Sequence, residues 1–279
     1  MRALTFTAVV LDTGELDLQP GFVIEADAVS SEGEITVEAL ARGGRVVAST
    51  PVPLVTPCGH PTDGAVEYPP QVAVGLVEFP AGASGLRVIH EGRTVLERTA
   101  PRRRGEPTAE WPATLDADTV SIPWRSPQDG ATASLGYSND AGETWTPLSL
   151  PTSEEAIAFD TRALPGGDRC LLELIVTDGF HTTRIRSPEY RVEPKGWVLW
   201  ILSPAPGAAL QYGAPVLLAA QAHHLEERRP GSEPIAWTSS LDGGLGEGAQ
   251  LLATLTRGAH TITATTAGVS SEVQVSVEA

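Results

Sequence analysis

The stretch Tyr137-Ser138-Asn139-Asp140-Ala141-Gly142-Glu143-Thr144-Trp145 is a compact turn between two strand-like runs. The carboxylate of Asp140 can accept hydrogen bonds from backbone N–H groups across the turn, and Gly142 permits a tight bend. Trp145 supplies a large apolar side chain that can anchor the turn against the strands. We therefore expect Ser138, Asp140, Gly142 and Trp145 to form a structural turn in a β-sheet domain.

The region around this turn, residues 106–194, contains short strand-like runs separated by turn residues. The runs are Val120–Trp124, Ala133–Tyr137, Thr144–Leu148, Ala156–Phe159, Leu171–Val176 and Thr183–Arg186. Six or seven short strands with turn residues between them are typical of a β-sandwich.

Two further motifs follow the turn, Leu164-Pro165-Gly166-Gly167 before a strand and Thr177-Asp178-Gly179-Phe180 after it. With the turn, they make this region similar to the fibronectin type III and immunoglobulin-like domains of bacterial multidomain proteins. The resemblance covers roughly a third of the chain. It implies a sandwich module of the kind appended to bacterial secreted enzymes, adhesins and surface assemblies, and it assigns no activity.

The first region, residues 1–105, also consists of strands joined by sharp turns. Alternating runs flank Arg42-Gly43-Gly44-Arg45 and His90-Glu91-Gly92-Arg93, which is a hairpin pattern. Between these hairpins, residues 51–70 carry prolines and glycines that do not fit a central strand. We predict a long irregular loop there, and loops of this length are often functional or mobile.

The last region, residues 195–279, repeats the strand pattern and places Trp237 where an immunoglobulin-like third strand buries a tryptophan. Its Leu245-Gly-x-Gly and Gly258-x-His-Thr-Ile-Thr motifs resemble bacterial immunoglobulin-like domains. The chain is therefore predicted to be all-β, with three tandem immunoglobulin/fibronectin-III-like sandwiches in an elongated row. Their expected boundaries are 1–105, 106–194 and 195–279.

Arg102, Arg103 and Arg104 stand together between Pro101 and Pro107, at the first expected boundary. Adjacent arginines between prolines indicate an exposed, solvated connector. The alternative is that the three arginines dock a partner or expose a protease cleavage site.

Composition limits the classes of partner. The 279 residues carry a formal net charge of −16, with a pI near 4.7, so the chain repels nucleic-acid phosphates. Apolar residues make up 41% of the chain, enough to form cores. No unbroken run of about 18 apolar residues occurs, so no membrane span is expected.

The first residues of the chain bear on its compartment. The start of the chain, Met1 to Asp12, alternates apolar residues with threonine and reads as a first strand, not as a signal peptide. As written the sequence suggests the cytoplasm, although the domains that it resembles are often found in exported proteins. The two cysteines, Cys58 and Cys170, fall in different expected domains, so we predict free thiols.

The sequence flags no catalytic residues and no cofactor. The turn Ser138-x-Asp140-x-Gly142-x-Thr144-Trp145 fits the Asp-box of sialidase-like propellers, but a propeller repeats that motif in each blade and it occurs here once. There is no Gly-x-Ser-x-Gly elbow and no His-Glu-x-x-His. We therefore expect a protein that is not an enzyme.

Metal binding is not expected either, although two places offer ligands. Cys58 and His60 could contribute two soft ligands, but two more are missing nearby. Asp116 with Asp118, or the cluster of Asp12, Glu15 and Asp17, could offer hard oxygens to calcium, but both clusters are sparse.

We expect a non-catalytic scaffold or binding protein that contacts another protein through its strand faces, its sheet edges or the 51–70 loop. One alternative is a carbohydrate-binding accessory module, for which Trp111 and Trp197 are the candidate platforms. The other is a regulatory partner or substrate of a cytoplasmic enzyme such as a protease.

Replacing Asp140 by Ala should lower the free energy of unfolding by about 1 kcal/mol, the value of a lost capping interaction. Denaturant titration of both proteins measures this loss. An Asp140→Ala protein with unchanged stability that had lost a measured function would contradict the structural reading of the turn.

Overall fold

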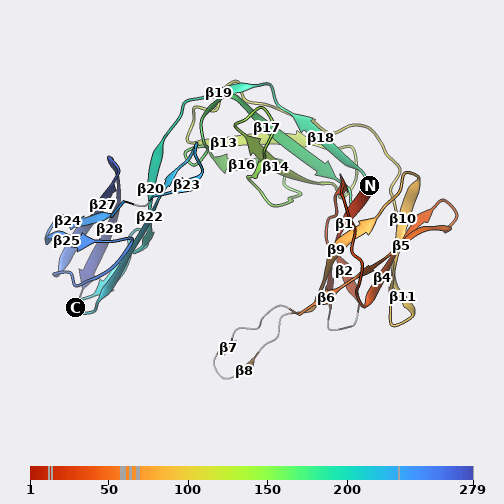
Figure 1. Ribbon diagram of the computed structural model, residues 1–279, viewed down its shortest axis with the longest axis horizontal. Helices are drawn as coiled ribbons and strands as arrows, with labels where there is room; N and C mark the ends of the chain where they lie inside the picture. Colours follow the sequence, from red (N-terminus) through yellow and green to blue (C-terminus); the bar gives the residue numbers. More distant parts are fainter. Residues whose placement is uncertain are drawn as a thin grey trace. The chain divides into compact units, whose positions relative to one another are not determined.

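The computed structural model describes residues 1–11, 13, 15–56, 61–62, 65–66, 70–231 and 233–278, with the side chains of 61–62 and 65–66 left out. Every regular element in these residues is a β-strand (Figure 1). The prediction of an all-β chain of sandwich domains is thus confirmed. No helix able to span a membrane occurs in the described ranges.

The chain divides into two compact units. The first comprises Met1–Ser138, Trp145–Phe159 and Leu171–Pro188, and the second comprises Asn139–Thr144, Asp160–Cys170 and Glu189–Ala279. This division cuts through the expected middle domain, and the boundaries 1–105, 106–194 and 195–279 stay a prediction.

Two antiparallel sheets share one core in the N-terminal region. The first has the order β2-β1-β9-β6 with β3 paired to β1, and its strands are β1 (Arg2–Val10), β2 (Leu16–Leu18), β3 (Val23–Glu25), β6 (Leu54–Val55) and β9 (Val72–Glu78). The second has the order β11-β10-β4-β5, and its strands are β4 (Ile35–Ala41), β5 (Val46–Val52), β10 (Ala83–His90) and β11 (Arg93–Thr99). In a separate two-stranded sheet, β7 (Pro61–Thr62) pairs antiparallel with β8 (Ala65–Val66).

Both predicted hairpin turns of this region are present. Gly43 and Gly44 have φ values of 80° and 78° between β4 and β5, and Glu91 and Gly92 have 50° and 75° between β10 and β11. The second pair spans a two-residue loop between His90 and Arg93 and is the mark of a type I′ turn, whose twist matches that of the strands. In the first hairpin the Gly44 N–H donates to the carbonyl of Ala41, so the turn is centred on Arg42 and Gly43.

The predicted irregular loop at 51–70 is wrong at its start. Pro51 and Val52 belong to β5, and β6 pairs with β9. Pro51 is tolerated because β5 is an edge strand, where a missing N–H costs no ladder bond. Cys58 and His60 lie outside the described residues.

The middle region also contains two sheets. One has the order β12-β13-β16, with strands β12 (Thr108–Ala109), β13 (Thr119–Arg125) and β16 (Ala156–Asp160). The other has the order β15-β14-β17-β18 with β19 paired to β17, and its strands are β14 (Thr132–Ser138), β15 (Thr146–Pro147), β17 (Gly167–Thr177), β18 (Thr182–Arg186) and β19 (Tyr190–Val192). Side chains alternate between buried and exposed along β13, so Val120, Ile122 and Trp124 face inward.

The C-terminal region repeats the arrangement around a core that includes Trp237. One sheet has the order β20-β22-β23 with β26 paired to β22, and its strands are β20 (Trp197–Ser203), β22 (Val216–His224), β23 (Arg229–Pro230) and β26 (Gln250–Ala253). The other has the order β21-β28-β27-β24-β25, and its strands are β21 (Ala209–Gln211), β24 (Ala236–Ser239), β25 (Gly243–Glu247), β27 (Gly258–Thr266) and β28 (Val269–Glu278). The predicted burial of Trp237 is confirmed, because its side chain is 1% exposed.

The motif Thr177-Asp178-Gly179-Phe180 joins β17 and β18 to the N-terminal core. Phe180 belongs to that core cluster, and its ring centroid lies 6.1 Å from that of Phe79. Asp178 holds the turn, because its Oδ1 accepts hydrogen bonds from the backbone N–H groups of Phe180 and His181. Thr177 Oγ1 donates to the carbonyl of Gly21 over 2.7 Å, which fastens the turn to the chain beside β3.

The second unit contains a comparable joint around Glu226, which follows β22. Its carboxylate accepts hydrogen bonds from the backbone N–H groups of Gly166, Lys195 and Gly196 at 2.8 to 2.9 Å. Burial alone would raise the pKa of Glu226, but these backbone donors hold it below its usual value. Leu164-Pro165-Gly166-Gly167 is thus tied to the β22–β23 connection.

Lys195 and Arg228 complete this joint. Lys195 Nζ donates to the carbonyls of Thr161 and Leu164, and burial lowers the pKa of this amine. Arg228 donates to Asn139 Oδ1 and Thr144 Oγ1, both in the turn that follows β14. The turn and the Leu-Pro-Gly-Gly motif therefore contact the C-terminal sandwich.

Replacing Phe180 by Ala should lower the free energy of unfolding by roughly 3 kcal/mol or more, because a buried aromatic ring leaves a cavity in the N-terminal core. Denaturant titration followed by tryptophan fluorescence measures the loss. Leu150, with 85% of its surface exposed, gives the matched control, since Leu150→Ala should change stability by less than about 0.5 kcal/mol. Equal effects of the two substitutions would contradict the assigned role of Phe180.

Replacing Glu226 by Gln should cost roughly 1–3 kcal/mol at pH 7, because an amide cannot satisfy all three N–H groups. A lowered folded-state pKa means that the stabilisation is complete above the unfolded value of 4.5 and is lost as the pH falls through the folded value. The difference in melting temperature between the two proteins should therefore narrow in acid. A gap that stayed constant from pH 7 to pH 2 would rule out a charge-based role for Glu226.

Candidate functional site

The turn that the sequence singled out has the expected geometry. Thr144 donates to Asp140 from its backbone N–H over 2.9 Å and also from its hydroxyl. Ala141 and Gly142 have φ values of 60° and 89°, and Ser138 is buried at the end of β14. Since Arg228 also contacts this turn, its residues form part of a joint, a contact that the local motif did not predict.

Trp145, which the sequence predicted to anchor the turn, is half-buried. The Arg186 guanidinium lies 5.3 Å from the centre of its ring. Arg186 and Arg184 also donate to the buried carboxylate of Glu173. The indole therefore packs against a paired, charged strand surface, and its role is to cover that surface.

The three arginines of the first connector are exposed, and two of them are paired. Arg103 donates to Glu106 over 2.6 and 2.7 Å, and Arg104 donates to Asp129 over 2.6 Å. Arg102 has no ion pair or side-chain hydrogen bond within the described ranges. The connector is thus held by its neighbours at two points, and its role as a docking or cleavage site stays a prediction.

No group of three or more His, Cys, Asp or Glu side chains that could hold a metal occurs among the described residues. The possible ligands Asp12, Cys58 and His60 lie outside them. Cys170 is buried, and its Sγ lies 3.3 Å from the carbonyl of Gly167.

Ser239, His260 and Asp242 in the C-terminal sandwich have the composition of a catalytic triad, which sequence reasoning did not single out. Ser239 Oγ lies 2.8 Å and Asp242 Oδ2 lies 3.7 Å from the same nitrogen, Nδ1 of His260. The other nitrogen, Nε2, lies 2.7 Å from the carbonyl of Thr256. A triad needs its serine and its carboxylate on different ring nitrogens, so this buried set fits a structural brace of the β24–β25 turn.

The most unusual surface of the described chain is the outer face of the sheet formed by β20, β22 and β26. Leu199 and Leu218 point into the core, so their neighbours Trp200, Leu202 and Leu217 point outward. Trp200, Leu202, Leu217 and Leu252 are 39%, 65%, 43% and 68% exposed. We call these four residues the outer face.

The register of the strands brings members of the outer face together. Leu217 pairs directly with Leu252 across β22 and β26, so their side chains are neighbours on one side of the sheet. On β20, Trp200 lies beside His223 of β22, with ring centroids 5.7 Å apart. None of the three strands contains Asp, Glu, Lys or Arg. The result is a charge-free apolar surface on a strongly acidic protein.

The sequence contained a signal for this surface. Trp197–Leu202 and Val216–Ala220 are unbroken apolar runs, whereas a strand with one solvated face alternates apolar and polar residues. Such runs predict a strand that is covered on both sides, and in this structure one side is uncovered.

The two aromatic residues proposed for glycan binding are poor platforms. Trp197 has the Arg229 guanidinium 4.8 Å from its ring centre and the edge of His224 at 5.3 Å. Trp111 is half-buried. A sugar-binding platform needs an open aromatic face, and the Arg229 guanidinium and the His224 ring occupy that space beside Trp197.

Comparison with known proteins finds similarity to solved structures only at low identity. No family model and no curated protein sequence matches the chain. Similar solved structures include the fibronectin(III)-like modules of Clostridium thermocellum CbhA, at 13% identity over 62% of this chain and 94% of that chain, with a TM-score of 0.24. The four N-terminal Ig domains of Dscam1 are 9% identical over 93% of this chain and 77% of that one, with a TM-score of 0.22. A Dpr2 complex with DIP-Theta is 15% identical over 57% and 90%, with a TM-score of 0.22. The similar structures also include trypsin-activated alpha-2-macroglobulin from Escherichia coli, at 11% identity over 100% of this chain and 24% of that one, with a TM-score of 0.24.

Proposed function

We propose that the chain is a non-catalytic scaffold that binds another protein through the outer face of its C-terminal sandwich. The observation that carries this proposal is the exposure of Trp200, Leu202, Leu217 and Leu252 on one charge-free sheet surface. Contiguous apolar surface costs free energy in water, and on soluble proteins it marks interaction sites.

The composition of the outer face favours a protein partner over a sugar. Tryptophan and leucine bury large apolar areas, and an exposed tryptophan is a frequent centre of protein interfaces. Trp200 pairs with Gln221 across β22 and lies beside His223, but the three leucines of the outer face offer a sugar no hydrogen-bonding group. A standard interface buries about 800 Å² on each partner, so the outer face would form its centre and the strand ends its rim.

Charge narrows the choice of partner. Each copy carries a net charge of −16, so two copies repel each other at long range. A partner with an apolar patch and a basic rim would be attracted to the acidic surface and would match the charge-free centre. Binding to such a partner should weaken as the salt concentration rises.

The test is affinity capture from the native organism with three baits, the natural chain, Leu252→Asp and Leu150→Asp. Leu252 and Leu150 are both exposed leucines, at 68% and 85%, so the two variants make the same chemical change in different places. We expect a protein that is retained by the natural chain and by Leu150→Asp and is lost with Leu252→Asp. Circular dichroism of both variants checks that the fold is kept.

Three results would overturn the proposal. They are a partner retained equally by all three baits, a partner lost with both variants, and a glycan that binds the natural chain through Trp200 in the absence of any protein partner.

A further inference from the structure

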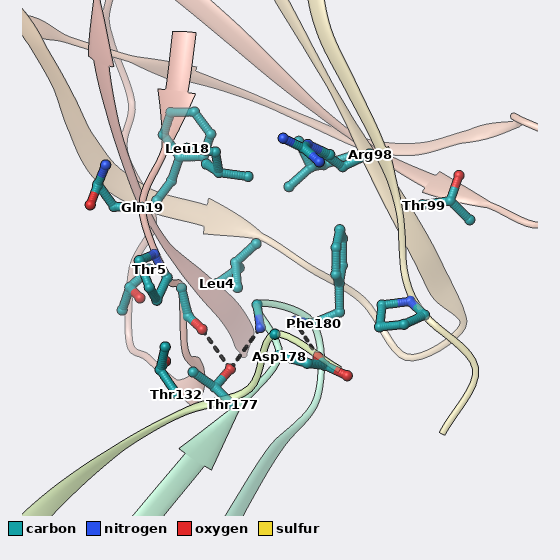
Figure 2. A pocket seen from close by; sticks show the side chains of 17 residues that line it. Leu4, Thr5, Leu18, Gln19, Arg98, Thr99, Thr132, Thr177, Asp178 and Phe180 are labelled. Carbon is teal, nitrogen blue, oxygen red and sulfur yellow. Dashed lines mark hydrogen bonds between the residues drawn. The ribbon is translucent and has the colours of Figure 1, made fainter. Parts of the chain in front are cut away.

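A second place in the structure is suited to a ligand, and it lies in the first unit, separate from the outer face. The turn Thr177–Phe180 and the strands of the N-terminal sandwich enclose a cavity of about 340 Å³ (Figure 2). Its apolar lining includes Leu4, Leu18, Leu86 and Phe180. This volume is at the small end of ligand pockets, so it fits one large side chain.

Most polar side chains around this cavity are already engaged within the protein. Thr5 accepts from the N–H of Phe22, Gln19 donates to Asp17, and Thr177 bonds to Gly21 and Gly179 (the bonds of Thr177 are dashed in Figure 2). Asp178 accepts from its own turn and pairs with His181.

Arg98 differs from these groups. It is exposed, lines the cavity near Leu18 (Figure 2), and has no ion pair or hydrogen bond from its side chain to another residue of the described chain. The cavity therefore combines an apolar floor with one uncommitted positive charge.

A groove adjoins the cavity, since Thr99 and Pro101 line both. It has a volume of about 780 Å³, and its lining residues include Arg42, Arg102 and Arg103. Arg103 is paired with Glu106, whereas neither Arg42 nor Arg102 has an ion pair within the described ranges. The carboxylate of Glu97 in the groove is paired with Arg87.

We propose that the cavity and this groove together bind an acidic peptide segment of a partner protein. One apolar side chain of the peptide enters the cavity beside Phe180, and the carboxylates next to it pair with Arg98, Arg102 and Arg42. The argument rests on charge complementarity, because Arg98 at the cavity and Arg42 and Arg102 in the groove have no carboxylate partner within the described ranges, on a protein whose net charge is −16. Arginine suits this task because its planar fork pairs with carboxylates in a fixed geometry.

In this arrangement Arg102, in the connector at residues 102–104, would bind a carboxylate of the peptide. Carboxylates bound by Arg98 and Arg102 would lie on either side of Thr99 and Pro101, along the chain that leaves β11. Because the turn Thr177–Phe180 also lines the cavity, a bound peptide would contact residues on both sides of the Phe180 joint. Binding should therefore raise the melting temperature of the protein.

The test uses fluorescent peptides of about eight residues with one central Phe flanked by glutamates. Two analogues replace all the glutamates by glutamine, or the Phe by alanine, and 3-phenylpropionate serves as a small acid without a peptide chain. Fluorescence anisotropy with the full chain, with phenylpropionate as a competitor, gives the affinities. We expect the acidic Phe peptide to bind at least about tenfold more tightly than either analogue and than phenylpropionate.

Three protein variants locate the site. Arg98→Gln, and the double variant Arg42→Gln with Arg102→Gln, should each weaken binding about fivefold or more. Arg93→Gln is the matched control, since Arg93 is an exposed arginine on the same strand as Arg98 and does not line either space. All the substituted side chains are exposed, so the variants should keep the melting temperature of the free protein.

Equal binding of the glutamate and glutamine peptides, equal effects of Arg98→Gln and Arg93→Gln, or phenylpropionate binding as tightly as the peptide would overturn the proposal. So would the absence of measurable binding at millimolar peptide. None of these results bears on the outer face, because Leu252→Asp leaves the groove unchanged and the arginine variants leave β20, β22 and β26 unchanged.

Discussion

The side chain of Phe180 completes the core of a sandwich formed by strands about a hundred residues earlier in the chain. This packing is the constraint on which the first unit depends. The ring can reach that core only because Asp178 accepts the two backbone N–H groups that follow it and so fixes the turn. Two threonines then tie the turn to the backbone beside β3, Thr177 to the carbonyl of Gly21 and Thr182 to the N–H of Val23. The burial of the Phe180 ring and the hydrogen bonds that hold the turn therefore stabilise the same packing.

In the second unit, charged side chains hold a connecting loop against a neighbouring sandwich, as the ring of Phe180 does in the first unit. A loop that passes close to another sandwich leaves backbone N–H groups without strand partners, and such groups are costly to bury. Glu226 satisfies three of them, and Lys195 supplies donors to two carbonyls of the adjoining loop. Side chains that act in this way determine how a connecting segment is held.

The sequence predicted the local structure well, because alternation and turn chemistry are local properties. The strand pattern, the glycine turns at Gly43 and Gly92, the Asp140 turn and the burial of Trp237 all follow from neighbouring residues. The partners of these motifs could not be predicted in the same way. Nothing near Phe180 in the sequence identifies Phe79 as its neighbour, and nothing near Asn139 identifies Arg228.

The candidate sites were harder to predict from the sequence than the fold, because their residues come together only through contacts between distant parts of the chain. The outer face had a signal in the apolar runs of β20 and β22, but only the register of Leu217 with Leu252 shows that these residues form one surface. Likewise, Arg102 was visible as part of a basic connector, whereas Arg42 and Arg98 join it only through folding. Arg42, Arg98 and Arg102 are candidates for binding a ligand because no carboxylate of the described chain pairs with them. Whether an arginine has such a partner depends on the folded structure and cannot be read from neighbouring residues.

The central claim is that side chains of the motifs fasten each joint by bonding to the backbone of a neighbouring segment. Amide hydrogen exchange of the intact chain, followed residue by residue by NMR, tests it most directly. The informative amides are those of Val23, Gly166 and Gly196, whose acceptors are the side chains of Thr182 and Glu226. The account predicts exchange at these amides that is slowed to the level of the sheet interiors. Exchange as fast as that of exposed loops, in a chain whose sheets remain protected, would contradict it.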